Sequence, residues 1–288
     1  MAKTKDEDTA LPNGAPTETL SFITALFLTR FPGCGTAFLH EVFNQVRSAF
    51  DGTYPGYQGC DTAYHNLAHT CQAAVALVCI LDGQYKSDQS PALASRDYEL
   101  SFASILLHDI GFLKEVGDNL GTGAKYTLNH VDRGVNFAAK LLPPLGVTRD
   151  EIRQVQLSIR STAMNVDMSK LPFRGPRERF IGCAVGSADL LGQMAALDYP
   201  ERLPGLYREF VEASAYVPPA KDGFAPCQSA EDLLRGTRDF YHGYARRMFD
   251  HEWDGVYQLL RYHFPDGRNH YVEAIEANLD RIDRLLEN

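Results

Sequence analysis

Residues 102–109 read Phe-Ala-Ser-Ile-Leu-Leu-His-Asp, so His108 and Asp109 stand side by side at the end of an apolar run. Apolar runs of this kind belong in a protein core. Burying an imidazole beside a carboxylate is unfavourable unless the two groups are paired or bind a metal. Divalent metals of borderline softness accept imidazole nitrogen and carboxylate oxygen together. The pair therefore predicts a metal site.

Two other stretches supply ligands of the same types. Residues 64–69 read Tyr-His-Asn-Leu-Ala-His and end in His69, and Asp189 follows the mostly apolar stretch 180–188. Alone, each residue has an ordinary explanation, such as a core or capping histidine or a buried aspartate paired with an arginine. Together with the adjacent His-Asp pair, they predict one metal site assembled from distant parts of the chain.

The ordered set resembles the signature of the HD superfamily of metal-dependent phosphohydrolases, which is one His, an adjacent His-Asp pair and a distant Asp. The Tyr-His-Asn-x-x-His motif of residues 64–69 is similar to that of the cyclic-nucleotide phosphodiesterases. The resemblance covers residues 60–195. It implies an all-α fold, a helical bundle of the HD-domain type.

The resemblance also implies roles for the site residues. The first metal ion would be held by His69, His108, Asp109 and Asp189, with Asp109 able to bridge two ions at the catalytic centre. His65 would donate a proton to the leaving oxygen, a role that suits an imidazole, whose ordinary pKa is about 6.5. Because His65 and His69 are four residues apart, we expect them on one face of a helix.

A second ion is a further implication. His130 is a candidate ligand for it, and a surface or capping role is the alternative. Members with two ions usually carry another His about a helix later, but residues 159–164 read Ile-Arg-Ser-Thr-Ala-Met. We therefore expect one or two divalent ions, the second held largely by water. Their identity among Mg, Mn, Zn, Fe, Co and Ni is left open.

Three residues are candidates for substrate binding. Lys125 lies in a glycine-rich loop that opens after the His-Asp pair, and Arg133 follows that loop, so both cations could contact a phosphate. Ordinary solvated surface charges are the alternative. Asn66 could orient either the substrate or the start of a helix.

The composition limits the partners. The chain has 288 residues, a net charge of −9 and a pI near 5.5, which argues against a dedicated nucleic-acid binder. The polar first residues lack a signal-peptide core, and residues 22–28 are too short an apolar run to cross a bilayer. We expect a cytoplasmic protein with reduced cysteines, no membrane partner and a small phosphoester as its ligand. A homo-oligomer is compatible with the sequence.

Helical periodicity dominates the whole chain. We expect a disordered tail over residues 1–17 and one helical domain over 18–288, whose part 196–288 extends the signature region. Thr17 is a candidate N-cap, and Thr148 with Glu151 matches a capping box. Helices are expected over residues 18–30, 36–50, 65–82, 95–113, 129–142, 148–162, 176–194, 200–215, 228–248, 253–263 and 268–286.

The function that follows is hydrolysis of a phosphoester, of a nucleotide or a similar small molecule, by a metal-activated water. Two alternatives remain. The first is an HD-fold di-iron oxygenase, although such proteins generally carry the late His that is missing here. The second is a non-catalytic HD module that binds a metal or a ligand, although a decayed site usually loses one of its ligands.

Overall fold

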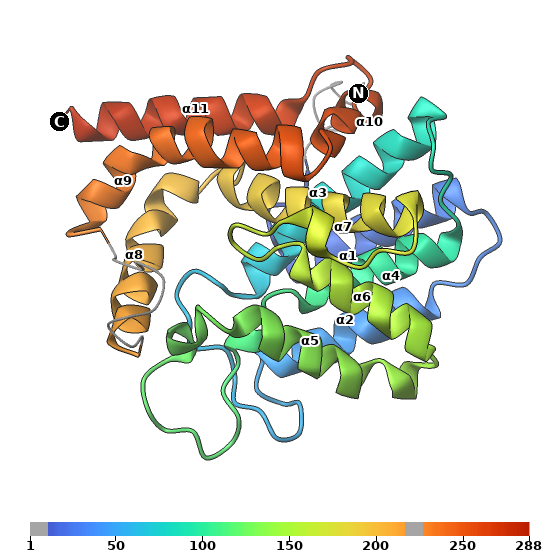
Figure 1. The fold of residues 1–288 in the computed structure, drawn as a ribbon, viewed down its shortest axis with the longest axis horizontal. Coiled ribbons are helices and arrows are strands. Elements are labelled where there is room, and N and C mark those ends of the chain that lie inside the picture. The colour runs from blue at the N-terminus through green and yellow to red at the C-terminus, as the bar shows by residue number, and fades with distance from the viewer. Residues whose placement is uncertain (1–10, 217–226, 288) are drawn as a thin grey trace, which may run out of the picture.

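The computed structural model describes residues 11–216 and 227–287. Within these ranges the chain is all-α, as predicted, and the only extended pairing is an isolated bridge between Tyr57 and Glu115. Figure 1 shows the arrangement of the helices. They are α1 (Pro16–Arg30), α2 (Ala37–Phe50), α3 (Leu67–Ser87), α4 (Ser95–Leu107), α5 (His130–Leu141), α6 (Arg149–Arg160), α7 (Pro176–Met194), α8 (Tyr199–Ala215), α9 (Ala230–Asp239), α10 (Leu260–His263) and α11 (His270–Leu286).

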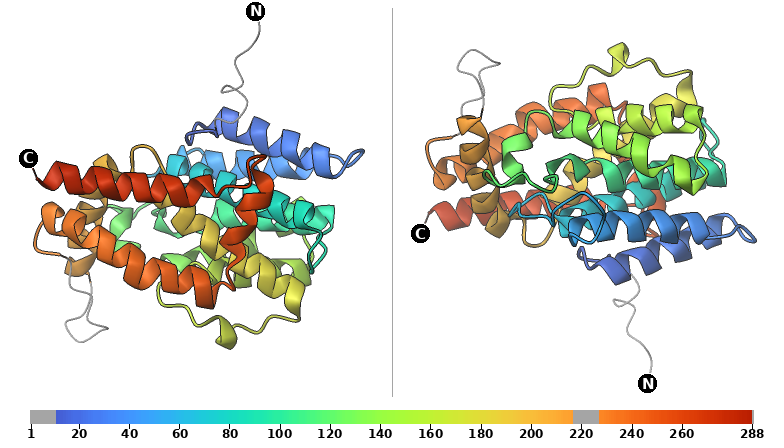
Figure 2. Two further views of the ribbon diagram at one scale, coloured as in Figure 1. Left: turned by 90° about the horizontal axis from the view of Figure 1, so that it is seen from above. Right: turned by 90° about the horizontal axis from the view of Figure 1, so that it is seen from below.

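Helix α3 is the centre of the bundle. Every residue from His69 to Gln84 is buried, and a helix that is buried on all sides needs neighbours all round. Helices α1, α4, α7 and α10 supply them. Helices α9 and α11 run side by side (Figure 2), and α11 packs against α7. α3 has the length and apolar composition of a membrane span, but 89% of that stretch is buried inside the protein, as in the core helix of a soluble protein.

Helices α3 and α7 touch backbone to backbone. A Cβ atom placed on Gly192 of α7 would lie 2.6 Å from the Cα and the amide nitrogen of Ala73 in α3. Only glycine permits so close an approach. The contact lies one helical turn from His69 on α3 and one turn from Asp189 on α7, so it sets the distance between these two predicted ligands.

Replacement of Gly192 by alanine tests this contact. We expect Gly192→Ala to lower the free energy of unfolding by about 1–3 kcal/mol, because the added methyl group forces two helices apart. Gly236→Ala in α9 is the matched control, since nothing lies within 4 Å of its added Cβ. That variant should be neutral or stabilise by up to about 1 kcal/mol, because alanine favours a helix. Urea unfolding measures both, and equal effects would contradict the account.

The predicted capping signals divide into one that is confirmed and one that is wrong. The Thr148 hydroxyl accepts a hydrogen bond from the Glu151 amide, and the Glu151 carboxylate accepts one from the Thr148 amide, so the capping box is present. Thr17 is not an N-cap. Because α1 begins with Pro16, whose ring favours the first turn of a helix, Thr17 lies inside that turn.

Two helix boundaries near the predicted site differ from expectation. The helix expected over 65–82 begins only at Leu67, because Asn66 is extended and caps it. His65 therefore precedes the helix and does not share a helical face with His69. The helix expected over 95–113 ends at Leu107, because Asp109 leaves helical geometry with φ −101° and ψ 1°, and a 3₁₀ turn, Ile110–Phe112, follows.

Two features at the ends of the chain complete the fold. The helix expected over 228–248 is regular only to Asp239 and continues as π-helical turns, Phe240–Ala245 and Met248–Glu252. Of the tail expected over residues 1–17, residues 1–10 lie outside the described part of the structure.

All six cysteines are free thiols, of which Cys71, Cys79 and Cys183 are buried.

Candidate metal centre

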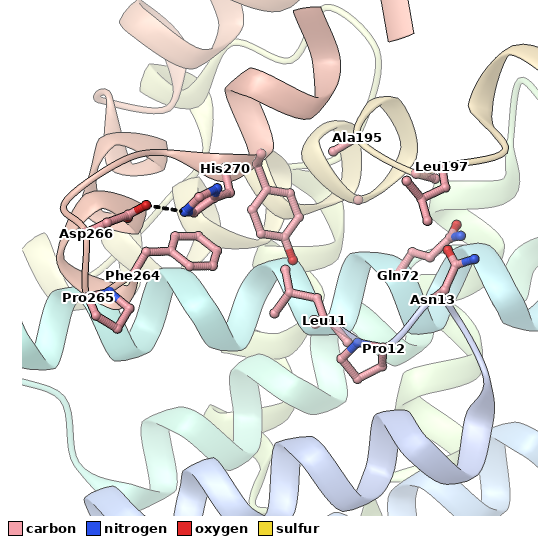
Figure 3. Close-up of a pocket in the computed structure, with 14 residues that line it drawn as sticks. Leu11, Pro12, Asn13, Gln72, Ala195, Leu197, Phe264, Pro265, Asp266 and His270 are labelled. Carbon is pink, nitrogen blue, oxygen red and sulfur yellow. Dashed lines mark hydrogen bonds and ion pairs between the residues drawn. The ribbon is translucent and has the colours of Figure 1, made fainter. Parts of the chain in front are cut away.

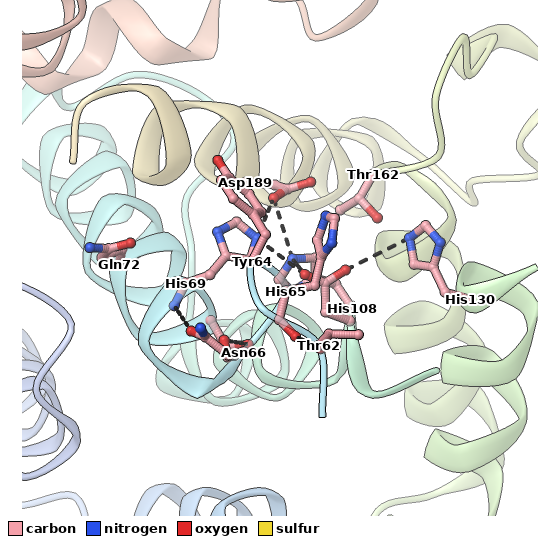
Figure 4. Close-up of polar contacts among 12 residues, drawn as sticks. Thr62, Tyr64, His65, Asn66, His69, Gln72, His108, His130, Thr162 and Asp189 are labelled. Atoms are coloured by element: carbon pink, nitrogen blue, oxygen red, sulfur yellow. Dashed lines mark hydrogen bonds and ion pairs between the residues drawn. The ribbon is translucent and has the colours of Figure 1, made fainter. Parts of the chain in front are cut away.

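Four side chains converge from three parts of the chain (Figure 4). His69 comes from α3, His108 and Asp109 follow α4, and Asp189 comes from α7. His69 Nε2 lies 3.1 Å from Asp109 Oδ2 and 3.2 Å from Asp189 Oδ1. His108 Nε2 lies 3.1 Å and 3.3 Å from the same two oxygens. The fold thus brings together all four residues that the sequence predicts as ligands of the first ion.

These separations suit one divalent ion. Ligands about 2.1 Å from an ion lie about 3.0 Å apart at octahedral angles and about 3.4 Å apart at tetrahedral angles. His108 Nε2 and Asp109 Oδ2 are fully buried, and beyond the close approaches within this group they have no hydrogen-bond partner among the described residues. Buried polar atoms rarely stay unpaired in proteins, and a cation would satisfy both. The buried group of His69, His108 and Asp109 could therefore hold a metal ion.

Hydrogen bonds to the backbone fix the orientation of the ligands. His108 Nδ1 lies 2.7 Å from the carbonyl oxygen of Ile105, so it is the nitrogen that donates. Its Nε2 then faces the carboxylates and would offer a lone pair to a metal ion after losing its proton, an arrangement common for metal-binding histidines. The Asn66 side chain accepts from the amides of Ala68 and His69, which anchors the start of α3. Of the two roles open to Asn66, the structure displays the helix-capping one.

The charges at the site support each other. Burial alone would raise the pKa of Asp109, but the facing His108 holds it well below its usual range. The pKa of Asp189 is lowered in the same way. Burial would lower the pKa of His108, but the two carboxylates raise it well above its usual value. The carboxylates are therefore anionic, and an arriving metal ion would displace a proton from His108.

His130 lies beside this group at the start of α5. Its Nδ1 is 2.7 Å from the Thr127 carbonyl oxygen, and its Nε2 is 3.7 Å from Asp109 Oδ1, the oxygen not shared by the first two histidines. Burial lowers the pKa of His130, so the ring is neutral at pH 7. A neutral ring with a free Nε2 facing a carboxylate has the chemistry of a metal ligand.

Glu209 is a site residue that the sequence analysis missed. It lies on α8, within the region treated as an extension, and its side chain is 3% exposed. Its Oε2 lies 2.5 Å from His65 Nδ1, and its Oε1 accepts the backbone amides of Tyr64 and His65. No local pattern marks this glutamate on an amphipathic helix. The need of a buried His65 for a partner was the one available signal.

An aromatic ring connects two of the histidines. Phe112 lies nearly parallel to both His65, with ring centroids 4.4 Å apart, and His130, at 4.5 Å. Phe112 is buried in the 3₁₀ turn that follows Asp109. The break of α4 at the His-Asp pair thus places an apolar ring between His65 and His130, two further candidate site residues.

The two cations predicted to bind phosphate have protein partners. Lys125 Nζ pairs with Asp118 and donates to the carbonyl of Leu120. The Arg133 guanidinium donates to the carbonyls of Gly111 and Leu113 and stacks over the Tyr126 ring. Both hold the loop after the His-Asp pair in place, and a substrate-binding role for them stays a prediction.

One side of the centre faces outward. The side chains of His69, His108 and Asp109 are 1–4% exposed, whereas those of His65, Asp189 and His130 are 15%, 17% and 21% exposed. The first three form a closed floor and the other three an accessible rim. A ligand would therefore approach between His65, His130 and Asp189.

Comparison with protein families gives a match over most of the chain. The profile of the Npun_R2479-like family matches residues 51–251, which is more than half of the chain and includes all the residues above. The chain belongs to this family. The matched region extends past the signature and takes in α8 with Glu209. A search of curated proteins found no match.

Loss of the central carboxylate tests the metal centre. We expect purified protein to hold about one or two divalent ions per chain and Asp109→Ala to lose most of them, because two histidines then face only Asp189. Elemental analysis after gel filtration measures this. The matched control is Asp132→Ala at an exposed aspartate on α5. Wild-type protein that stays metal-free after reconstitution would contradict the assignment.

Proposed function

We propose that the chain is a metal-dependent phosphohydrolase of the HD superfamily that cleaves a phosphoester of a nucleotide or a similar small molecule. The observation that carries this proposal is the convergence of two histidines and two aspartates at separations of 3.1–3.3 Å. His65, which is hydrogen-bonded to Glu209 and lies on the accessible rim, supports the proposal further, because a hydrolase needs a proton donor as well as a metal.

A divalent ion, when bound, supplies Lewis-acid chemistry, lowering the pKa of a water molecule to about 7 and offsetting the charge of the phosphoryl oxygens. The chain's own residues supply the rest. His69, His108, Asp109 and Asp189 would hold the ion on the closed floor. The rim leaves one face open, so the substrate phosphate can approach while the buried side excludes competing water.

His65 is suited to protonate the leaving oxygen. Because its Nδ1 hydrogen is held by Glu209, its second proton sits on Nε2, on the side away from α8. Burial alone would lower the pKa of His65, but the Glu209 hydrogen bond and the nearby aspartates raise it above 6.5. The protonated form therefore persists to a higher pH than in a free imidazole.

A second ion is compatible with the proposal. His130 and the outer oxygen of Asp109 supply two ligand atoms, and residues 159–164, where two-ion members usually carry a further histidine, contain none. Such an ion would keep several waters, which is the habit of Mg²⁺. The small number of protein ligands at the second site also favours hydrolysis over the di-iron oxygenase chemistry of some HD proteins. Measurement of O₂ consumption would reveal oxygenase activity.

The leaving-group role of His65 has a specific test. We expect His65→Ala to keep its metal but to lose turnover of a nucleoside or alkyl phosphoester by about 10²–10⁴-fold. The same variant should be far less impaired on a nitrophenyl phosphoester, whose leaving group scarcely needs a proton. His242→Ala, at an exposed histidine on the C-terminal helices, is the control. Equal losses on both substrates, with metal retained, would rule out proton donation.

Glu209 gives a prediction for the pH profile. His65 must be protonated to act, so the rate should fall as pH rises through its pKa. Glu209→Gln removes the charge that raises this pKa and should move the alkaline limb to lower pH by on the order of 1 unit. The amide can still accept the backbone hydrogen bonds, so metal content should not change. An unmoved alkaline limb would show that Glu209 does not act through His65.

A further inference from the structure

A groove of about 470 Å³ lies apart from the histidine centre. Its walls come from residues 11–13, from α3, from the end of α7 and from the segment that leads into α11 (Figure 3). None of the candidate metal ligands lines it. Its volume falls within the range of sites that bind small molecules, and nothing in the proposed phosphohydrolase reaction uses it.

The middle of the groove is apolar and one end carries amides. Leu11, Val75 and Tyr271 supply apolar lining, and Val75 and Tyr271 are buried members of the core. Asn13 and Gln72 lie close together at one end (Figure 3). Gln72 is only 6% exposed, and its Oε1 accepts from Arg202, which leaves its NH₂ group as a donor at that end.

The opposite end joins aromatic rings to a carboxylate. Phe264 packs against His270, with ring centroids 4.5 Å apart, and His270 Nε2 lies 2.9 Å from Asp266 Oδ2. The amide of Arg268 donates to the other oxygen of Asp266 and lowers the pKa of that carboxyl, so it is ionised at neutral pH. No lysine or arginine is among the described residues that line the groove.

We propose that this groove binds a small organic cation, with a protonated amine at the Asp266 end and a flat apolar body along Phe264 and Tyr271. The carboxylate and the aromatic faces both attract a cation, and the apolar walls favour a ring. An anion would meet the Asp266 carboxylate, and the one basic side chain among the described lining residues, His270, already pairs with that carboxylate. The groove therefore selects a charge opposite to that of a phosphoester, and its ligand is not the substrate of the histidine centre.

The groove also adjoins elements of that centre. Gln72 is one turn beyond His69 on α3, and Gly192, which lines the groove, is one turn beyond Asp189 on α7. Arg202 donates to both Gln72 Oε1, at 2.9 Å, and the carbonyl of Tyr64, at 2.6 Å. A bound cation would thus touch the two helices that carry metal ligands.

Calorimetric titration with tryptamine tests the proposal, with indole-3-propionate as an anion of the same ring system. We expect tryptamine to bind the full-length protein with a dissociation constant of about 1 mM, as suits a ligand of this size. Asp266→Asn should weaken binding about threefold to fivefold, because the pair is solvent-exposed. Leu197→Lys, which places a cation on a 71% exposed wall position at the opposite end of the groove from Asp266, should weaken it less, by about twofold.

Controls make the outcome decisive. Asp150→Asn removes an exposed carboxylate on α6, distant in sequence from the groove, and should leave tryptamine binding unchanged. Leu197→Lys changes a surface side chain, so the variant should fold, which its unfolding temperature will show. The proposal is overturned by any of three results: no saturable binding of tryptamine, equal binding of indole-3-propionate, or binding unaffected by both groove variants.

Discussion

The structure depends on keeping two imidazoles and two carboxylates together inside an apolar bundle. His69 and His108 face Asp109 and Asp189 at contact distances, and within the described part of the chain His108 Nε2 and Asp109 Oδ2 have no other polar partner. Burying such a group is energetically unfavourable unless a bound cation pairs with its carboxylates and imidazoles. The close contact of α3 and α7 at Gly192 and the break of α4 at the His-Asp pair both serve this convergence.

A second layer of residues turns the cluster from a binding site into a candidate reaction centre. Glu209 reaches across from α8 to orient His65, and Phe112 supports the rings of His65 and His130. These contacts join the region around the His-Asp pair to a helix that follows it by a hundred residues. The family match over residues 51–251 spans both, which agrees with one functional unit.

The sequence predicted the parts of this account that depend on local pattern. The helical class, the capping box at Thr148 and the four ligand residues follow from periodicity and from polar residues placed on apolar runs. The helix start at Leu67, the break after Leu107 and the role of Glu209 did not follow. The Asn66 side chain accepts hydrogen bonds from backbone amides and so starts the helix late, and Asp109 has non-helical backbone angles. Glu209 contributes only through its contact with His65, which is distant in sequence. None of these features has a periodic signal in the sequence.

The most direct test is the position of the metal itself. Crystals grown with Mn²⁺ and measured at the manganese absorption edge should show an anomalous peak about 2.1 Å from His69 Nε2, His108 Nε2 and the inner oxygens of Asp109 and Asp189. A weaker second peak near His130 would fit the two-ion arrangement. An empty centre under these conditions, or a peak bound elsewhere in the protein, would contradict the account.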